Sequence, residues 1–523
     1  MNNVLDKRRA GILLHITSLP STLGLGNMGR NAYRFVDFLK TCNLSVWQVL
    51  PIHPLHRVPI DTPYRDFLSP YQPMSVFAGN PMLINLRKLI EKGWLQRMGF
   101  PNNSSDWFME QVFEYRHKYL KDSYDYFEKH ASSEDKQSFD HFVNQHDWLK
   151  DYALFCVLKD FYHGDCWWDW SDIGHRNHDF DALDRFVNQG DNQHCLEQYY
   201  FEQFAFFAQW QELKQYANDN GVYLFGDMPF FVARDSVEVW AHREYFQLDE
   251  QGIPLFLSGF SPKSDYFQPE NGQCWGHPLY NWDVASEDSF RWWLKRFGAA
   301  NDLFNLVRLT YFQGFQHCWA VPNETPINFA HGKWQSTAGR SLFTELRKQN
   351  LSVGLIAEDI GVADEVIQLR DEFKFLGIKL LQLAFDIKKS GSPLGNYHLP
   401  HNHLPRDVVY TGTHDSDTAK SWFFSERTGE NQVDKEKRQN FVCSYLDAKA
   451  EDMPFPLIRA AFQSSSKLAM IPMQDLLSLG KECRMNTPGT SNSSNWRWQL
   501  QWLQITQEIE QKVKDWVERY ERN

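Results

Sequence analysis

Eight short apolar runs, each ending in polar or turn-forming residues, constrain the fold of this chain more than any other feature. A strand buried on both faces of a parallel sheet has this pattern where it delivers side chains to the edge of the sheet. The runs, each given with its first residue, are AGILLHITSLP (Ala10), SVWQVLPIHP (Ser45), GVYLFGDMPFF (Gly221), LVRLTYFQGF (Leu306), VGLIAEDIG (Val353), GIKLLQLAFD (Gly377), DVVYTGTHDSD (Asp407) and LAMIPMQDLL (Leu468).

Segments with helical periodicity lie between most of these runs. NAYRFVDFLKTC follows the first run from Asn31, and EVIQLRDEFKFL follows the fifth from Glu365. Strands that alternate with helices predict a parallel sheet, and eight such units predict a closed barrel. The expected fold is therefore α/β, a (β/α)8 TIM barrel.

Two stretches between the runs are too long for simple loops. We expect a mostly helical subdomain at about 83–220, between the second and third strands. A second insertion at about 235–300 contains Gly and Pro clusters and is expected to form a long loop and a helix. The whole chain, 1–523, is then one decorated barrel, closed by an amphipathic helix after Trp496.

The net charge and the lengths of the apolar stretches limit the kinds of partner that we expect for this chain. A formal net charge of −12 argues against nucleic acid, because phosphate binding relies on clustered Lys and Arg. No apolar stretch is long enough for a signal peptide or a membrane span, so we expect a soluble, cytoplasmic protein without a membrane partner. Eight cysteines are scattered without the spacing of a metal site, and no nucleotide motif is visible, so no metal and no cofactor are expected.

Polar residues close five of the eight runs. The ends of barrel strands and the loops after them build the active site in this fold, so these five polar ends, four of which bear acids, are expected to meet at one rim. A lone acid at a strand end is more often a helix cap than a catalytic group. The residues in question are Asp227, Arg308 with Thr310, Glu358 with Asp359, His414 with Asp415, and Gln474 with Asp475.

Long strings throughout the chain carry a family resemblance. They include GILLHITSLPSTLGLGNMG, SPYQPMSVFAGNPMLINL, GDMPFFVARDSVEVWA, CWGHPLYNWD, IAEDIG, YTGTHDSDT, PMQDLLSLG and RMNTPGT, in this order. With these motifs the chain resembles an amylomaltase, a 4-α-glucanotransferase of the α-amylase superfamily. The resemblance implies an α-1,4-glucan or maltooligosaccharide as ligand, and transfer of a glucan with retention of the anomeric configuration.

Retention needs two carboxyl groups, one that attacks the anomeric carbon and one that serves as acid and base. The resemblance implies that Glu358 is the acid/base and that Asp415 stabilises the transition state. It also implies that Arg308 lies beside the nucleophile and orients it. The substrate-binding positions implied in this way are Tyr71, Asp235, Trp275, Arg308 and His414.

The nucleophile position departs from the family pattern. The family segment resembles VRIDHFRGF, whereas this chain reads VRLTYFQGF, so Thr310, Tyr311 and Gln313 replace an Asp, a His and an Arg. A neutral hydroxyl attacks poorly without a base and offers no charge to the transition state. We therefore expect glucan transfer to be lost or very weak, and Arg308 to lack a carboxylate partner, which makes the site more positive.

Three functions are compatible with the sequence. The first is an active glucanotransferase. The second is a pseudoenzyme that binds glucan and serves a sensing or scaffolding role with an unknown protein partner, and the third is a transferase with a different donor or acceptor. Tyr311 as a substitute nucleophile is disfavoured, because neighbouring side chains on a strand point to opposite faces. Inverting hydrolysis, with Glu358 as acid and Asp415 activating water, is a further alternative.

Overall fold

The computed structural model describes residues 4–22, 24–56, 68–99, 109–261, 272–282, 288–324, 331–385, 393–427, 430–490 and 494–523. A closed barrel of eight parallel strands forms its centre, in the order β1-β12-β11-β10-β9-β6-β3-β2. The barrel strands are β1 (Arg9–Leu13), β2 (Val46–Gln48), β3 (Tyr223–Met228), β6 (Leu306–Leu309), β9 (Gly354–Ala357), β10 (Leu376–Leu380), β11 (Asp407–Tyr410) and β12 (Leu468–Pro472). Each coincides with one of the eight apolar runs, although β1 and β10 begin one residue before their runs, so the predicted TIM barrel is confirmed.

The barrel strands are apolar because both of their faces are covered. Val46, Phe225, Ile356 and Met470 come from four different strands and pack together in a fully buried cluster. Helices cover the outer surface; those outside the long segment between β2 and β3 are α1 (Arg30–Thr41), α9 (Val237–Ala241), α10 (Asp288–Leu303), α11 (Gly339–Leu346), α12 (Asp364–Glu372), α13 (Leu381–Ala384), α14 (Ala419–Phe424), α15 (Gln432–Leu446), α16 (Phe455–Gln463), α17 (Met473–Leu476) and α18 (Gln507–Arg519).

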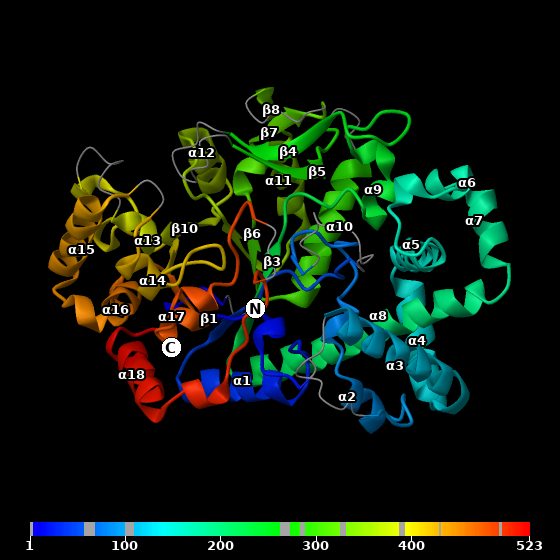
Figure 1. Ribbon diagram of the computed structural model, residues 1–523, viewed down its shortest axis with the longest axis horizontal. Helices are drawn as coiled ribbons and strands as arrows, with labels where there is room; N and C mark the ends of the chain where they lie inside the picture. Colours follow the sequence, from blue (N-terminus) through cyan, green and yellow to red (C-terminus); the bar gives the residue numbers. More distant parts are fainter. Residues whose placement is uncertain are drawn as a thin grey trace.

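The segment 83–220 is helical in its described part and lies to one side of the barrel (Figure 1). Its rings, among them Trp94, Phe127 and Phe204, pack against one another, with centroids of Trp94 and Phe204 5.0 Å apart. That this segment is a subdomain of its own stays a prediction. Its helices are α2 (Leu86–Glu91), α3 (Met109–His130), α4 (Ser133–Gln145), α5 (Leu149–Phe161), α6 (Ile173–Arg176), α7 (Phe180–Val187) and α8 (Asn192–Asp219).

A second, antiparallel sheet lies above the barrel in Figure 1. It contains β4 (Phe256–Phe260), β5 (Gln273–Pro278), β7 (His317–Pro322) and β8 (Lys333–Ser336), in the order β5-β4-β7-β8. The expectation of a long loop and a helix at about 235–300 is therefore incomplete, because β4 and β5 lie there together with α9 and α10. The central pair joins β4 to β7, which belong to different insertions of the barrel.

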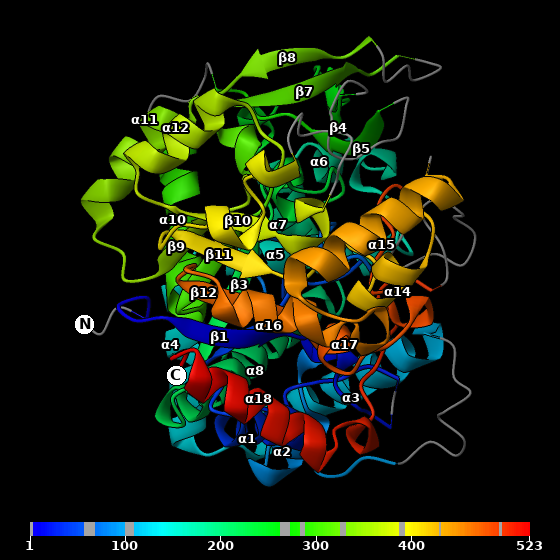
Figure 2. The same ribbon diagram turned by 90° about the vertical axis from the view of Figure 1, so that its left-hand side faces the viewer.

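The predicted terminal helix is present as α18. It lies beside α16 on the outside of the barrel (Figure 2). Val513 and Val517 are its buried positions. Beyond the helix, the fully buried Arg522 donates hydrogen bonds to five backbone carbonyls, those of Arg9, Ala461, Phe462, Ser464 and Ser466. The backbone N–H of Ala10 in β1 donates to the carbonyl of Arg522 at 3.1 Å. The last residues are thus bound to the first strand.

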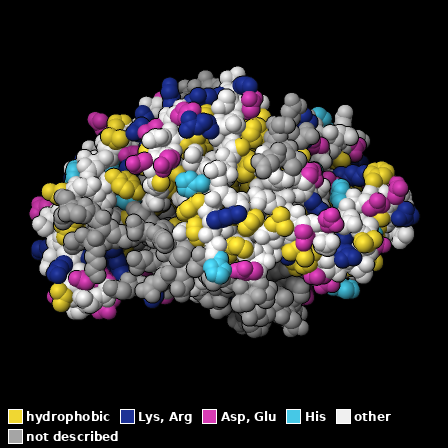
Figure 3. Space-filling model, turned by 90° about the horizontal axis from the view of Figure 1, so that it is seen from above, with side chains coloured by type: hydrophobic (Ala, Val, Ile, Leu, Met, Phe, Trp, Pro, Cys, Tyr) yellow, Lys and Arg dark blue, Asp and Glu magenta, His cyan; other side chains and the backbone are white. Residues whose placement is uncertain are grey.

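The face seen from above in Figure 3 carries acidic and basic side chains intermixed. Within the described ranges, no helix combines the length and the apolar character needed to cross a membrane.

Candidate active site

An ion pair between neighbouring strands forms the base of the site. Asp227 of β3 and Arg308 of β6 are register partners, so their side chains leave the barrel at the same level. The Arg308 guanidinium donates from Nε to Asp227 Oδ1 at 3.1 Å and from Nη2 to Oδ2 at 2.7 Å. Both residues are at most 2% exposed. This bidentate geometry fixes the planes of both groups.

Tyr71 joins this ion pair to the neighbouring loop. Its hydroxyl donates to Asp227 Oδ2 at 2.6 Å and accepts from Arg308 Nη2 at 2.8 Å. Its ring stacks on His414, with centroids 5.2 Å apart and planes 12° from parallel. Burial raises the pKa of the Tyr71 hydroxyl well above its ordinary value. Tyr71 is therefore a neutral, fixed donor beside two charged groups.

Glu358 follows β9 and lies on the other side of Arg308. Its Oε1 is 3.4 Å from Arg308 Nη1, and its Oε2 accepts the backbone N–H of Tyr311 at 2.7 Å. Tyr311 has a left-handed backbone, with φ of 53°, which is uncommon for a bulky residue and aims its N–H at the carboxylate. Burial raises the pKa of Glu358, whereas Arg308 opposes the rise. A carboxyl group with a raised pKa suits a general acid.

Thr310 is half-buried at the end of β6. Its hydroxyl donates to Asp227 Oδ1, and its backbone N–H donates to the carbonyl of Met228 at 3.1 Å. The expectation that Arg308 lacks a carboxylate partner is wrong, because the paired Asp227 occupies that role and Glu358 lies on its other side. One guanidinium thus faces two carboxyl groups, and the site is not made more positive.

Asp415 lies beyond the end of β11, next to His414. Its Oδ2 is 3.4 Å from His414 Nε2, and its Oδ1 accepts from Asn486 Nδ2 at 2.6 Å. Arg484 Nη2 donates to the backbone carbonyl of Asp415 at 2.7 Å. Arg484 and Asn486 lie in the segment RMNTPGT, but the sequence analysis predicts no role for them. The feature that could have identified them is that they are the two polar residues at the start of this family motif.

The two remaining predicted residues lie in different surroundings. Trp275 of β5 meets the ring of Tyr311 edge to face, with centroids 5.0 Å apart, so it borders the site. Asp235 contacts the helical segment through Lys159, whose Nζ donates to Oδ2 at 2.8 Å. His56, which follows β2, has its Nδ1 3.7 Å from the same oxygen. A direct contact of Asp235 with sugar stays a prediction.

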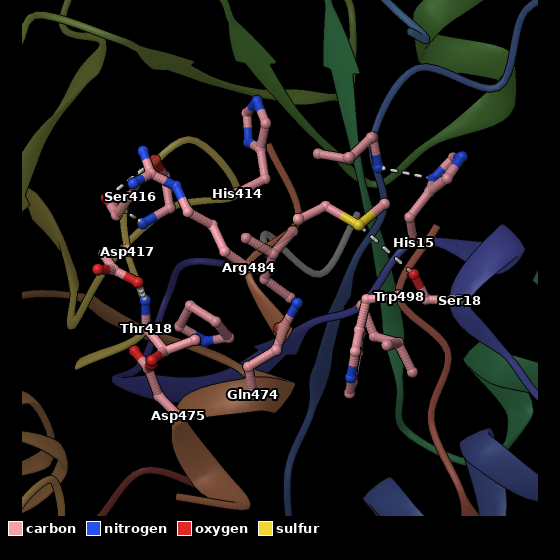
Figure 4. Close-up of a pocket in the computed structure, with 16 residues that line it drawn as sticks. His15, Ser18, His414, Ser416, Asp417, Thr418, Gln474, Asp475, Arg484 and Trp498 are labelled. Atoms are coloured by element: carbon pink, nitrogen blue, oxygen red, sulfur yellow. Dashed lines mark hydrogen bonds between the residues drawn. The ribbon is translucent and has the colours of Figure 1, made fainter. Parts of the chain in front are cut away.

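A cavity of about 420 Å³, including its open mouth, lies beside this cluster, between the ends of β1, β11 and β12 (Figure 4). His15, which sequence reasoning did not single out, lines it. The backbone N–H of Leu50 donates to His15 Nδ1 at 3.2 Å, which places the ring proton on Nε2, and burial lowers the pKa of His15 to about 3. His15 is thus a neutral donor. In the described part of the chain, no group of His, Cys, Asp and Glu side chains is suited to hold a metal ion.

Comparisons with known proteins assign the family. The sequence model described as 4-alpha-glucanotransferase matches residues 14–506. The 4-alpha-glucanotransferase of Thermus thermophilus is 39% identical, over 98% of this chain and 99% of its own length. That of Aquifex aeolicus is 38% identical, over 94% of this chain and 95% of its own. The chain belongs to the 4-alpha-glucanotransferase family.

Solved structures agree with the family assignment. The amylomaltase from Streptococcus agalactiae in complex with acarbose superposes with a TM-score of 0.87 at 30% identity, covering 99% of this chain and 100% of that one. The amylomaltase from Corynebacterium glutamicum has a TM-score of 0.74 at 16% identity, covering 98% of this chain and 75% of that one, and supports the fold alone. The decorated barrel is thus that of a 4-alpha-glucanotransferase.

Proposed function

We propose that this 4-alpha-glucanotransferase relative binds α-1,4-glucans while its own transfer of glucan is lost or very weak. One observation carries the proposal: Thr310 stands at the end of the fourth barrel strand, and its hydroxyl donates a hydrogen bond to Asp227. A retaining mechanism needs an attacking carboxylate within reach of the anomeric carbon in addition to the acid/base. Thr310 supplies no carboxylate.

The surroundings of Thr310 also fail to activate its hydroxyl. The only base that its hydroxyl contacts among the described residues is Asp227. This carboxylate already accepts two hydrogen bonds from Arg308 and one from Tyr71, so both of its oxygens are engaged by other donors. A hydroxyl without a free base beside it is a poor nucleophile.

Glucan binding is supported by the contacts that fix the predicted sugar-binding residues in place. Tyr71 and His414 are stacked, Asp415 is held by Asn486, and Glu358 is paired with Arg308. The structure of the amylomaltase from Streptococcus agalactiae, which this chain resembles, is that of a complex with acarbose. We propose Tyr71, Trp275, Arg308, His414 and Asp415 as the sugar-binding side chains of this chain.

An active 4-alpha-glucanotransferase is the second candidate. Similarity along nearly the whole chain to proteins that carry this name favours it, as does the pairing of Glu358 with Arg308. Incubation with maltotriose separates the two candidates, because transfer yields glucose and longer oligomers. A ladder of longer products from the unaltered protein would refute the inactive reading.

Restoring the carboxylate is the sharper experiment. We expect Thr310→Asp, alone or with Gln313→Arg, to raise the rate of maltotriose disproportionation by about 10³-fold or more, since removing a nucleophile commonly costs about 10⁴-fold. Thr310→Asn is the matched control, because it has the shape of Asp without its charge, and should leave the rate unchanged. Equal rates in the Asp and Asn variants would show that Thr310 is not what limits transfer.

Binding is tested separately by calorimetric titration with maltoheptaose. Binding by the unaltered protein, without turnover, is the expected result. Failure to bind at millimolar ligand would remove glucan as the ligand of this site.

A further inference from the structure

Asp475 is a buried carboxylate that the proposed function does not use. It follows β12, lies in α17 and is 1% exposed. Its Oδ2 accepts the hydroxyl proton of Thr411 at 2.6 Å, and its Oδ1 accepts the backbone N–H of Ala419 at 2.7 Å. Asp475 is among the residues that line the cavity, and Figure 4 shows it next to Thr418. One side chain therefore binds two points that are eight residues apart in sequence.

Those two points are the two ends of a loop. Thr411 directly follows β11, and Ala419 is the first residue of α14. Residues 411–418, called here the 411–418 loop, carry His414 and Asp415. Because both ends of the loop are bound to one carboxylate, Asp475 fixes the distance between them. The path of the loop, and with it the place of Asp415, depends on that distance.

Other contacts hold the middle of the same loop. Gln382 Nε2 donates to the carbonyl of Asp417 at 2.8 Å, and the backbone N–H of Asn486 donates to the carbonyl of His414 at 3.1 Å. Arg484 and Asn486 bind Asp415 itself. The 411–418 loop is thus held by α13, by the segment after α17 and, at both ends, by Asp475.

Satisfying the first N–H groups of α14 accounts for only part of this arrangement. α14 already has a cap, because the hydroxyl of Thr418 accepts the backbone N–H of Ser421 at 3.2 Å. The bond from Thr411 also contributes nothing to α14. Burial, reinforced by the nearby Asp417, raises the pKa of Asp475 to about 6, so keeping a carboxylate here costs stability. The geometry carries the argument, because the two bonds of Asp475 join separate points of the chain, which capping one helix does not require.

We propose that Asp475 is a positioning residue that clamps both ends of the 411–418 loop and so sets His414 and Asp415 for a bound glucan. The glucan part of this statement rests on the proposed function. The clamp, meaning the two hydrogen bonds from Thr411 and Ala419 to Asp475, does not depend on the proposed function.

The test compares Asp475→Ala with Asp475→Asn. Alanine removes both acceptors, whereas an asparagine accepts from Ala419 through its oxygen and donates to the Thr411 hydroxyl through its nitrogen. Amide hydrogen exchange of residues 411–419 reports the loop, and calorimetry with maltoheptaose reports binding. We expect Asp475→Ala to speed exchange and weaken binding, each by about tenfold for two lost hydrogen bonds, and Asp475→Asn to stay within about threefold of the unaltered protein.

Thr506→Ala is the stability control, because it removes the cap of the remote helix α18. It should change neither the exchange of residues 411–419 nor the affinity. If Asp475→Ala does not fold, Thr411→Val removes one of the two clamp bonds and should give smaller changes in the same direction.

The outcomes separate the two proposals. Exchange in residues 411–419 that matches the unaltered protein in both Asp475→Ala and Thr411→Val overturns the clamp, whatever the glucan result. Faster exchange with unchanged affinity overturns the positioning role. An unaltered protein that binds no maltoheptaose overturns the proposed function, and the clamp is then decided by exchange alone.

Discussion

Asp227 is the residue on which the charges of the site depend. Its carboxylate accepts from Arg308, Tyr71 and Thr310, and Arg308 in turn lies 3.4 Å from Glu358. Removing any one donor therefore changes the surroundings of a carboxylate that is shut off from water. Such a change costs more than the same change at the surface, because the buried acceptor finds no substitute partner.

Tyr71→Phe tests whether the loss of a hydrogen-bond donor costs more stability at the buried Asp227 than at the surface. We expect the variant to lose about 1–2 kcal/mol of unfolding free energy, because Asp227 Oδ2 loses a donor and Arg308 Nη2 an acceptor. The matched control is Tyr216→Phe, whose hydroxyl donates at 2.6 Å to Asp37 in an exposed pair. Urea unfolding of both variants at pH 7 gives the comparison. Equal losses would show that burial of Asp227 contributes nothing.

Sequence reasoning placed Asp227 and Arg308 at strand ends but gave a role only to Arg308. The missing step was register: β3 and β6 are neighbours in the barrel, and the two residues are partners across them. Register is set by packing around the whole barrel, which no single run reveals. Asn486 was missed for a related reason, since it lies in an irregular segment whose path is fixed only by contacts with His414 and Asp415.

Among the secondary-structure elements, predictability follows burial. Barrel strands such as β12 are buried along their whole length and show as continuous apolar runs. The antiparallel strands are not: β5 is mostly half-buried and contains Gly276 at a positive φ, and β8 is mostly exposed. The central pair of this sheet, β4 with β7, also joins two different insertions, so neither composition nor spacing marks it.

The contact between α5 and the loop after β3 depends on a buried ion pair. Lys159 and Asp235 have side chains that are 5% and 6% exposed, with Nζ 2.8 Å from Oδ2. We expect Lys159→Met to cost about 3–5 kcal/mol of unfolding free energy, because it leaves the Asp235 charge buried without its cation. Urea unfolding measures the loss.

The surface pair of Lys295 with Asp147 is the control, since its side chains are 50% and 68% exposed. Lys295→Met should cost about 0–1 kcal/mol. A similar loss in both variants would contradict a structural role for Asp235 and would return it to the list of groups facing the ligand.

Considered as a whole, the molecule holds several histidines in their neutral form. Burial lowers the pKa of His15 to about 3, and burial lowers those of His53, His277 and His403 to about 4. The unfolded chain binds protons at these residues near pH 6.5, whereas the folded chain does not. Their contribution is therefore complete above pH 6.5 and is lost as the pH falls toward 4. Asp475 acts in the opposite direction, because its pKa is raised to about 6.

We expect the unfolding free energy to fall by several kcal/mol between pH 7 and pH 5. Each of the four histidines contributes a loss of about 2 kcal/mol at pH 5, against a gain of about 1 kcal/mol from Asp475. His53→Asn isolates one contribution, because its amide replaces the bond of His53 Nδ1 to the carbonyl of Ala78, and should reduce the loss by about 2 kcal/mol.

The exposed His141 provides the control, and His141→Asn should leave the pH dependence as it is. Urea unfolding at both pH values measures all three proteins. A fall in stability of the same size in His53→Asn and in the unaltered protein would place the proton uptake at other groups.

The bonds between Arg522 and β1 have a consequence for the order of folding. They join the carbonyl of Arg9 and the N–H of Ala10 to a residue more than 500 positions later in the sequence. Contacts between such distant residues form slowly, because the chain between them loses conformational freedom when they meet. We therefore expect Arg522 to dock late, after β1 has paired with its barrel neighbours β2 and β12.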